Sequence, residues 1–350
     1  MVLGLVREAR AWLRPLLVAL FNRSISWSLR WRLLLLQPTV FLTYSIGKAP
    51  YVFSSPFQVE YLPVGPDGSL ARALVFKPGE RKISGGRKLR PLHVDIHGGA
   101  FIGGMPENFA SFNERIANET GAVVVSITYR YAPEHTFPAA IDDVDRTLEW
   151  LRLNAEARWD ADPSLMTISG SSAGANLALA AMQQPACQRP ASTAIKTCIT
   201  FYGVVDQRVS PWQKPRPDKM PKSDPTAVLM PLFDAYPAAA RKDHLDDPRL
   251  SPILADRKTL PGRMLMVIAA VDILVAEQME FVQRMREQHA AEPQSDADGD
   301  WLQVIIEDDG FHGYLEVPDF FVSKEIKARA SDPAVTLLRE VYEEFGWIWE

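Results

Sequence analysis

The stretch TISGSSAGANLALA, residues 167–180, places two adjacent serines between glycines. Ser172 has a glycine two positions before it and another two positions after it, which fits the pattern GxSxG, whereas Ser171 does not. The residues before Ser172 are typical of a strand and those after it of a helix, a context in which GxSxG forms a sharp turn that exposes the serine. Ser172 is therefore the candidate nucleophile, and its surroundings predict a fold that combines strands and helices.

Short apolar runs alternate with helical stretches from about residue 70 onward. Strands that alternate with helices in this way indicate a largely parallel sheet covered by helices on both faces, so the expected fold class is α/β. The expected strands are ALVFKP (73–78), PLHVDIH (91–97), AVVVSITY (122–129), MTISG (166–170), KTCITFYG (196–203), MLMVIAAV (264–271) and WLQVIIE (301–307). The expected helices span residues 140–153, 173–182, 275–288 and 333–345.

The domain organisation follows from breaks in this pattern. A chain of 350 residues with 47% hydrophobic content can bury one large core. We expect residues 56–203 and 249–350 to form that core, preceded by helices in residues 1–55. Residues 204–248 are rich in proline, lysine and aspartate and read as an insertion between two units of the sheet. A second break, residues 287–300, predicts a solvated acidic loop.

The N-terminal segment differs from the rest of the chain in charge. Residues 1–50 contain seven basic residues and one acidic residue, although the whole chain carries a net charge of -5. The net negative charge of the rest of the chain argues against a surface that binds nucleic-acid phosphates. Apolar residues at helical spacing in residues 5–20 predict an amphipathic helix, whose apolar face packs either on the protein or on an anionic membrane surface.

Targeting signals and cysteines indicate the cellular compartment in which we expect the protein. The start of the chain lacks the small-residue cleavage site of a secretory signal, and the uncharged stretch 33–47 is shorter than the roughly 18 to 20 apolar residues of a spanning helix. Cys187 and Cys198 stand far from any disulfide-framework or metal-ligand spacing. We expect a cytoplasmic protein without a metal site, and peripheral membrane contact through the basic N-terminal helices stays open.

A serine hydroxyl is a poor nucleophile at neutral pH, so it needs a base, an acid that orients the base, and donors for the oxyanion. HGGAFIGG, residues 97–104, follows an expected strand, and the N–H groups of such a glycine-rich turn can point at a developing negative charge. We expect Gly98 and Gly99 as oxyanion donors, with Ala173 as the third. A plain turn between strand and helix is the alternative interpretation. His97 precedes the serine and is expected to brace this loop.

The base is sought downstream of Ser172, because α/β-hydrolases carry their triad in the order serine, acid, histidine. The histidines that follow are His244, His289 and His312. His244 lies in the charged insertion and His289 at a polar helix end, where solvent-exposed histidines are common. His312 follows the strand 301–307 in the turn DDGFHGY, and a loop there can bring its imidazole over the serine. His312 is therefore the candidate base.

The candidate acid is Asp272, which directly follows the apolar run 264–271 and would also emerge at the carboxyl end of a strand. A cap for the helix expected next is the alternative role. Asp308 and Asp309 are rivals, but they lie so near His312 in sequence that a surface turn explains them better. The acid would hold the imidazole tautomer and stabilise the imidazolium without taking the proton.

Five motifs in this order resemble the hormone-sensitive-lipase family of α/β-hydrolases, which includes arylacetamide-deacetylase-like esterases. The motifs are HGGAF, YRYAPEHTFPAAIDDV (129–144), GSSAGAN, VDIL and GFHGY. The resemblance is strong over roughly residues 90–180 and moderate over 250–320. It implies an α/β-hydrolase fold with a mostly parallel central sheet, the triad Ser172, Asp272 and His312, and an oxyanion hole from Gly98, Gly99 and Ala173. It also implies a helical cap, built from the N-terminal helices and residues 204–248, over an acyl-binding cleft.

The chain departs from the pattern of this family at three positions. Ser171 stands where the family usually has aspartate, Ala175 where glycine is frequent, and Tyr131 where leucine is common. None of the three belongs to the implied triad, so these departures concern the shape of the pocket and the hydrogen bonds around the site. Asp143 matches a repeated aspartate of the family, and we expect it to be structural.

These observations predict a serine carboxylesterase that hydrolyses apolar short- to medium-chain acyl or aryl esters through an acyl-serine intermediate, without a cofactor. The expected partner is a small-molecule ester and not a nucleic acid. One alternative is a pathway-specific esterase, lactonase or acyltransferase of a biosynthetic route. Another is a non-catalytic small-molecule receptor on the same fold, against which the intact His312 argues.

Overall fold

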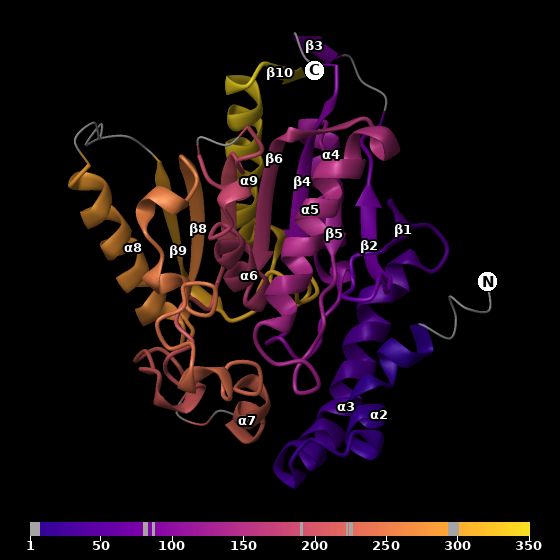
Figure 1. Ribbon diagram of the computed structural model, residues 1–350, viewed down its shortest axis with the longest axis vertical. Coiled ribbons are helices and arrows are strands. Elements are labelled where there is room, and N and C mark those ends of the chain that lie inside the picture. Colours follow the sequence, from indigo (N-terminus) through magenta and orange to yellow (C-terminus); the bar gives the residue numbers. More distant parts are fainter. Residues whose placement is uncertain are drawn as a thin grey trace.

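The computed structural model describes residues 8–79, 83–85, 88–189, 192–221, 223, 227–292 and 301–350. Most of the expected acidic loop, and the start of the expected N-terminal amphipathic helix, lie outside these ranges. Within them, eight strands form one sheet in the order β1-β2-β5-β4-β6-β7-β8-β9 (Figure 1). These strands are β1 (Phe57–Leu62), β2 (Ala71–Phe76), β4 (Arg90–Ile96), β5 (Val123–Ile127), β6 (Ala161–Ser171), β7 (Thr197–Phe201), β8 (Arg263–Val271) and β9 (Leu302–Phe311). A short separate pair joins β3 (Ile83–Gly85) to β10 (Trp347–Trp349).

The strands from β5 across to β9 are parallel, and β2 and β1 continue the sheet in antiparallel pairing. Parallel strands are usually buried on both faces and are therefore apolar at successive positions. In β8, Met264, Met266 and Ile268 belong to one buried cluster, whereas Leu265 and Val267 belong to the other. This burial on both faces explains why the apolar runs of the sequence mark the strands.

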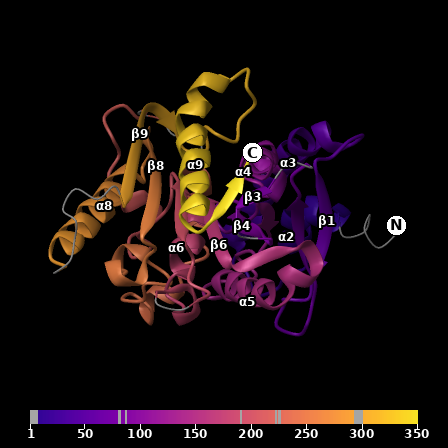
Figure 2. The same ribbon diagram turned by 90° about the horizontal axis from the view of Figure 1, so that it is seen from above.

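Helices cover both faces of the sheet. Figure 2 shows α4 and α9 on one side of it and α5 on the other. Residues of α4 and α9 join one buried cluster, and residues of α5, α6 and α8 join the other. The predicted α/β architecture is thereby confirmed. The helices are α2 (Arg14–Phe21), α3 (Trp27–Lys48), α4 (Ala110–Thr120), α5 (Ala139–Trp159), α6 (Ala173–Ala181), α7 (Met230–Phe233), α8 (Val275–Ala290) and α9 (Lys324–Glu344).

The N-terminal helices and the insertion lie at the same end of the molecule, opposite β3 and β10 (Figure 1). Nε of Arg32 in α3 donates a hydrogen bond to the carbonyl oxygen of Val228 at 2.7 Å, which joins these two segments directly. The insertion contains α7 and single 3-10 turns at Pro211–Gln213, Ala227–Leu229 and Ala240–Lys242. Further 3-10 turns lie at Ala49–Tyr51, Pro106–Phe109, Pro185–Cys187, Pro252–Leu254 and Arg257–Thr259. Across the described ranges, no helix has both the length and the apolar content needed to cross a membrane.

The C-terminal helix is longer than the sequence predicted. The expected start was Pro333, because proline suits the first turn of a helix. The helix α9 begins at Lys324 instead and contains Pro333 in its interior. Ala330 and Leu337, on either side of the proline, are both buried against the sheet. Tertiary packing of this apolar face therefore outweighs the hydrogen bond that the proline removes.

The strand β9 also continues beyond its expected end at Glu307. It runs to Phe311, through residues that were expected to form a turn. The pairing with β8 shifts register between Ala269 and Val271, and Val271 then pairs with Phe311. A bulge of this kind bends a strand and increases its twist. The residues that follow β8 and β9 are consequently side by side.

Asp143 of α5 binds the loop that follows β5. Its carboxylate accepts a hydrogen bond from the backbone N–H of Arg130 at 2.8 Å and forms an ion pair with the Arg130 guanidinium at 2.9 Å. Arg146, one turn further along α5, contacts the same carboxylate. Asp143 is buried, and these contacts hold the start of α5 to the loop after the carboxyl end of β5. They fit the structural role expected from the sequence.

Replacing Asp143 with alanine should lower the free energy of unfolding by about 2 to 3 kcal/mol, because charge-assisted hydrogen bonds are lost and the N–H of Arg130 loses its acceptor. Urea unfolding followed by circular dichroism measures this loss. Asp142→Ala is the matched control, since Asp142 makes a half-exposed ion pair with Arg249 and should cost less than about 1 kcal/mol. Equal losses in the two variants would contradict the structural role of Asp143.

Candidate active site

The candidate site lies where the chain changes direction across the sheet. From β4 the chain passes to β5 on one side and then to β6 on the other side of β4. In open parallel sheets such a switch point leaves a crevice at the carboxyl ends of the strands. Ile96 of β4 pairs with Gly170 of β6, so the loop that starts at His97 and the turn that carries Ser172 lie next to each other.

Ser172 occupies a sharp turn between β6 and α6. Its φ is +52° and its ψ is -116°, a conformation that residues other than glycine rarely adopt. A Cβ on Gly174 would lie 1.9 Å from the carbonyl oxygen of Ile96, and one on Gly170 would lie 2.3 Å from the carbonyl oxygen of Gly174. Both glycines of the GxSxG pattern are therefore required by the close approach of α6 to β4 and to its own turn.

Ser172, His312 and Asp272 form one hydrogen-bonded chain. Nε2 of His312 lies 2.8 Å from Oγ of Ser172, and Nδ1 of His312 lies 2.6 Å from Oδ2 of Asp272. Asp272 follows β8 and His312 follows β9, directly after the paired residues Val271 and Phe311. The structure thus brings together the three residues that the sequence analysis singled out.

The surroundings of Asp272 favour a positive charge on His312. Asp272 is buried, and its second carboxylate oxygen accepts a hydrogen bond from the N–H of Leu274 at 3.1 Å. One oxygen of Asp272 therefore binds the backbone before α8, and the other orients the imidazole of His312. Burial lowers the pKa of His312, but the charge of Asp272 and its hydrogen bond raise that pKa above the ordinary value for histidine. An imidazolium formed by proton transfer from Ser172 is stabilised in the same way.

The expected oxyanion donors border the turn of Ser172. A Cβ on Gly98 would lie 3.2 Å from the Cβ of Ser172. Gly99 has a φ of +122°, and a Cβ there would lie 2.3 Å from the carbonyl oxygen of Gly103, so only glycine fits. The N–H groups of Gly98, Gly99 and Ala173 donate to no other residue of the described ranges. Such uncommitted donors are what an oxyanion requires.

His97 braces the loop that carries these donors, as the sequence analysis expected. Its Nδ1 lies 2.6 Å from the carbonyl oxygen of Gly98, and its Nε2 lies 3.1 Å from the hydroxyl of Tyr131. The imidazole stacks on the ring of Tyr129 with a centroid distance of 4.7 Å. Burial lowers the pKa of His97 to about 4, so the ring is neutral near pH 7. Tyr131, one of the departures from the family pattern, is therefore part of this brace.

The N-terminal helices contact the same loop. Arg14 of α2 donates hydrogen bonds to the carbonyl oxygens of Ile102 and Tyr131 at 2.8 and 3.0 Å. Tyr44 of α3 donates to the carbonyl oxygen of Gly104 at 3.0 Å. The loop is consequently held from the N-terminal helices as well as from the sheet.

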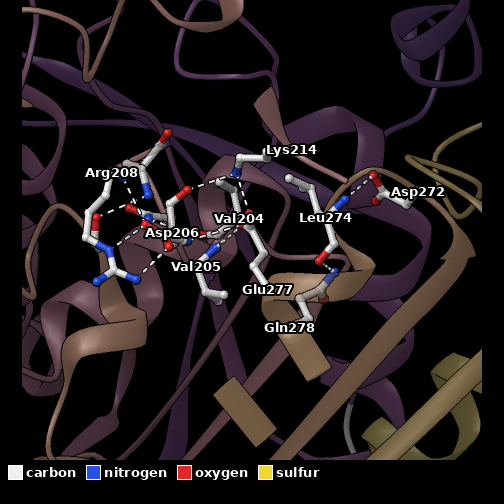
Figure 3. A network of polar contacts seen from close by, with 12 residues as sticks. Val204, Val205, Asp206, Arg208, Lys214, Asp272, Leu274, Glu277 and Gln278 are labelled. Carbon is white, nitrogen blue, oxygen red and sulfur yellow. Dashed lines mark hydrogen bonds and ion pairs between the residues drawn. The ribbon is translucent and has the colours of Figure 1, made fainter. Parts of the chain in front are cut away.

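A second polar network ties the start of the insertion to α8, the helix that follows Asp272 (Figure 3). Lys214 is only 7% exposed, and its Nζ lies 2.5 Å from a carboxylate oxygen of Glu277. The same Nζ donates to the carbonyl oxygen of Asp206 at 2.9 Å. Glu277 also accepts hydrogen bonds from the N–H groups of Val205 and Asp206 at 2.9 and 3.2 Å. The insertion is therefore anchored beside the carboxylate that orients the imidazole.

The remaining sequence candidates lie elsewhere. His244 of the insertion is 3.4 Å from a carboxylate oxygen of Asp247. His289 is half-buried against Trp301, with a ring-centroid distance of 4.8 Å, and not fully exposed as expected. Asp308 is an exposed residue of β9. Among the residues that the structure describes, no group of three or more His, Cys, Asp or Glu side chains could hold a metal ion.

Sequence reasoning missed one polar residue of the site, Glu316. Its carboxylate accepts hydrogen bonds from Asn108 at 3.0 Å, from the hydroxyl of Tyr202 at 3.2 Å and from Ser171 at 3.3 Å. The available signal was weak: an acidic residue among the apolar neighbours Leu, Val and Pro, shortly after His312. Its three partners come from separate parts of the chain, so no local pattern connects them.

A family model described as the alpha/beta hydrolase fold matches residues 93–298, which is more than half of the chain. The chain therefore belongs to this family. The predicted α/β-hydrolase fold and the resemblance to the hormone-sensitive-lipase family, with its arylacetamide-deacetylase-like esterases, are confirmed.

Its relatives within the family include several esterases. Esterase LipQ of Mycobacterium tuberculosis (strain ATCC 25618 / H37Rv) is 35% identical over 157 residues, which cover 43% of this chain and 36% of that protein. Arylacetamide deacetylase of Oryctolagus cuniculus is 36% identical over 110 residues, covering 31% of this chain and 28% of that protein. The chain thus spans about a third of the length of these curated relatives. A hyperthermophilic esterase from the archaeon Pyrobaculum calidifontis superimposes with a TM-score of 0.64 at 27% identity, over 82% of this chain and 86% of that chain.

Replacing Gly174 with alanine should push α6 away from β4, because the new Cβ would meet the carbonyl oxygen of Ile96. We expect a loss of more than about 3 kcal/mol in the free energy of unfolding, beyond the usual cost of overpacking. Chemical denaturation measures the loss, and labelling by a serine-directed phosphonate reports whether Ser172 keeps its reactivity.

Gly103→Ala is the matched control for this variant. Gly103 lies in the neighbouring glycine-rich loop, and a Cβ there meets no atom within 4 Å. Its stability should stay within about 0.5 kcal/mol of the wild type. A stable, phosphonate-reactive Gly174→Ala protein would show that the close approach is not needed.

Proposed function

We propose that the protein is a serine carboxylesterase with Ser172 as nucleophile, His312 as base and Asp272 as the orienting acid. The observation that carries this proposal is the hydrogen-bonded chain from Ser172 through His312 to Asp272. It meets the geometric requirement for an activated nucleophile, namely a hydroxyl within reach of a base that a carboxylate orients. The esterase names of the relatives support the same reaction class.

Acylation begins when Oγ of Ser172 attacks the carbonyl carbon of the ester. Nε2 of His312 accepts the hydroxyl proton in the same step. The carbonyl oxygen becomes an oxyanion and accepts hydrogen bonds from the N–H groups of Gly98, Gly99 and Ala173. The carbon–oxygen bond to the alcohol then breaks, His312 returns its proton to the leaving alcohol oxygen, and the acyl group stays on Ser172.

Deacylation repeats these steps with water as the nucleophile. Water gives a proton to Nε2 of His312 while its oxygen attacks the acyl carbon. The oxyanion forms in the same hole, the bond to Oγ of Ser172 breaks, and Oγ recovers the proton. Asp272 keeps the imidazole in the tautomer that presents Nε2 to the serine throughout. The products are one carboxylic acid and one alcohol.

The proposed substrate class is supported by the apolar side chains of Phe311 and of the insertion. Phe311, directly before His312, is exposed, as are Val209 and Trp212 in the anchored part of the insertion. Exposed aromatic and aliphatic side chains on segments proposed to border or cap the site suit an apolar ligand. We therefore propose short- to medium-chain acyl or aryl esters as substrates.

The N-terminal helices of residues 1–55 and the insertion 204–248 are proposed to form a cap over this site, on a catalytic core of residues 56–203 and 249–350. Three contacts support the cap. Arg32 joins α3 to the insertion, Arg14 joins α2 to the oxyanion loop, and Lys214 joins the insertion to α8. Elements in these positions would control the access of the ester to Ser172.

Ser172→Ala should lower the kcat for p-nitrophenyl acetate, butyrate, octanoate and palmitate by more than about 10⁴-fold, because the nucleophile is removed. Ser171→Ala should stay within about tenfold of the wild type. We expect the highest kcat/KM for butyrate or octanoate. A folded wild-type protein that hydrolyses none of the four esters would contradict the proposed activity.

We also propose that the protein is cytoplasmic and touches anionic membranes through its N-terminal helices. Both cysteines are free and buried, which suits a reducing compartment. Phe21 and Trp27, at the junction of α2 and α3, are 72% and 76% exposed. Arg10 and Arg23 lie exposed nearby in sequence. Exposed aromatic residues beside cationic ones suit the interface of a membrane that contains anionic lipids.

Charge reversal of both Arg10 and Arg23 to glutamate should weaken sedimentation with phosphatidylserine-containing vesicles by at least about tenfold, because each cation contributes roughly 1 kcal/mol near such a surface. Lys324→Glu, which reverses an exposed charge at the start of α9, is the matched control and should sediment like the wild type. Wild-type protein that stays in the supernatant with these vesicles would refute membrane contact.

A further inference from the structure

The carboxylate of Glu316 lies behind the nucleophile and belongs to none of the proposed catalytic roles. Glu316 is half-buried, and its two carboxylate oxygens accept hydrogen bonds from three side chains. One oxygen accepts from Asn108, and the other from Ser171 and Tyr202. A side-chain amide N–H and two hydroxyl groups can all donate, so this arrangement is built for an ionised carboxylate.

The first link from Glu316 leads to the nucleophile turn. Ser171 is buried and directly precedes Ser172. A Cβ on Gly98 would lie 3.1 Å from Oγ of Ser171, so this hydroxyl also borders the oxyanion loop. By accepting the hydrogen bond of Ser171, Glu316 holds a side chain that precedes the nucleophile in sequence and borders Gly98, the first expected oxyanion donor.

The second link leads to the base through Tyr202. The ring of Tyr202 meets the imidazole of His312 edge-on, with centroids 5.3 Å apart, and the hydroxyl of the same ring donates to Glu316. The backbone of Tyr202 has a φ of +38°, which residues other than glycine rarely adopt. Glu316 therefore fixes the far end of the aromatic side chain against which the base packs.

Charge provides a third link. The charges that act on the pKa of His312 include those of Asp272 at the end of β8, Glu316 in the loop after β9, and Lys214 in the insertion. The two carboxylates favour the imidazolium, and Lys214 opposes it. Burial raises the pKa of Glu316 above its ordinary value, and its hydrogen-bond donors and the charge of His312 offset only part of that rise.

We infer that Glu316 is a positioning residue of the proposed esterase: its carboxylate fixes Ser171 and Tyr202 behind the nucleophile and the base, and its charge supports the imidazolium of His312. This inference rests on the proposed function. Glu316 acts through other residues and contacts no reacting atom. Its removal should therefore change kcat and the pH dependence of Ser172 reactivity, and leave KM nearly constant.

The test compares wild type and Glu316→Gln by the rate of labelling with a serine-directed phosphonate across pH. The labelling rate depends on the fraction of deprotonated His312 and on the reactivity of Ser172, and it can be measured without ester turnover. Loss of the charge lowers the pKa of His312, so the acidic limb of the profile should move to lower pH, by about one unit. The plateau rate should fall about tenfold, because one unit of lost imidazolium stabilisation corresponds to a factor of ten. Hydrolysis of p-nitrophenyl butyrate should show the same fall in kcat at nearly constant KM.

Asp95→Asn is the matched control. The carboxylate of Asp95 is also buried and also accepts hydrogen bonds from three side chains, those of Asn113, Ser126 and Ser169, but none of these belongs to the site. This variant should lose stability and keep the wild-type labelling profile. An equal shift of the acidic limb in Asp95→Asn would overturn the inference, since any buried carboxylate would then have the effect.

Tyr202→Phe keeps the inference testable if Glu316→Gln does not fold. This variant keeps the ring against His312 and removes one donor to Glu316, so the limb should move in the same direction by a smaller amount. An unchanged limb and plateau in a folded Glu316→Gln protein, or in Tyr202→Phe where that alone folds, overturns the inference. A wild type that is labelled but hydrolyses no ester refutes the proposed esterase, while the labelling profiles still decide the role of Glu316.

Discussion

The close approach of α6 to the end of β4 is the constraint on which the site depends. Gly174 lies so near the carbonyl oxygen of Ile96 that no side chain fits between them. This contact fixes the turn of Ser172 beside the loop of Gly98, and with it the geometry between the nucleophile and the oxyanion donors. The unusual backbone conformation of Ser172 costs free energy locally. The sheet, buried on both faces, supplies the rigid frame that maintains it.

The proposed base, His312, reaches the proposed nucleophile, Ser172, from the other half of the sheet. The shift of register that extends β9 places His312 beside Asp272, and the loop after β9 then carries Glu316 behind the serine. One short segment, residues 311–316, therefore delivers the imidazole and a second carboxylate together. In the site as proposed, the charges of Asp272 and Glu316 favour the imidazolium of His312, and that of Lys214 opposes it.

The elements that would select a substrate also support the catalytic loops. Arg14 donates hydrogen bonds to a carbonyl oxygen of the oxyanion loop and to one of the segment after β5, and Lys214 and Glu277 fasten the insertion beside the loop of Asp272. Protein interiors are densely packed, and they therefore transmit small displacements. A change in the proposed cap is therefore expected to alter the rate of the chemical step as well as the choice of ester.

The strand, turn and helix around Ser172 and the parallel core strands can be predicted from the sequence alone. Both are local patterns, a glycine spacing and apolar runs buried on two faces. The triad order and the positions directly after expected strands were also enough to favour His312 and Asp272 as candidates over their rivals. The edge strand β1 was not among the expected strands, which were identified from continuous apolar runs; in β1 the polar residues Gln58 and Glu60 alternate with apolar ones, as in a half-exposed strand.

The long-range contacts could be recognised only in the folded chain. The helix α9 passes through Pro333 because its apolar face packs on the sheet, which local propensity cannot anticipate. Glu316 gained a role because Asn108, Ser171 and Tyr202, from three distant parts of the chain, converge on its carboxylate. Local patterns report neighbours along the chain, whereas partners such as these become neighbours only when the sheet brings its strand ends together.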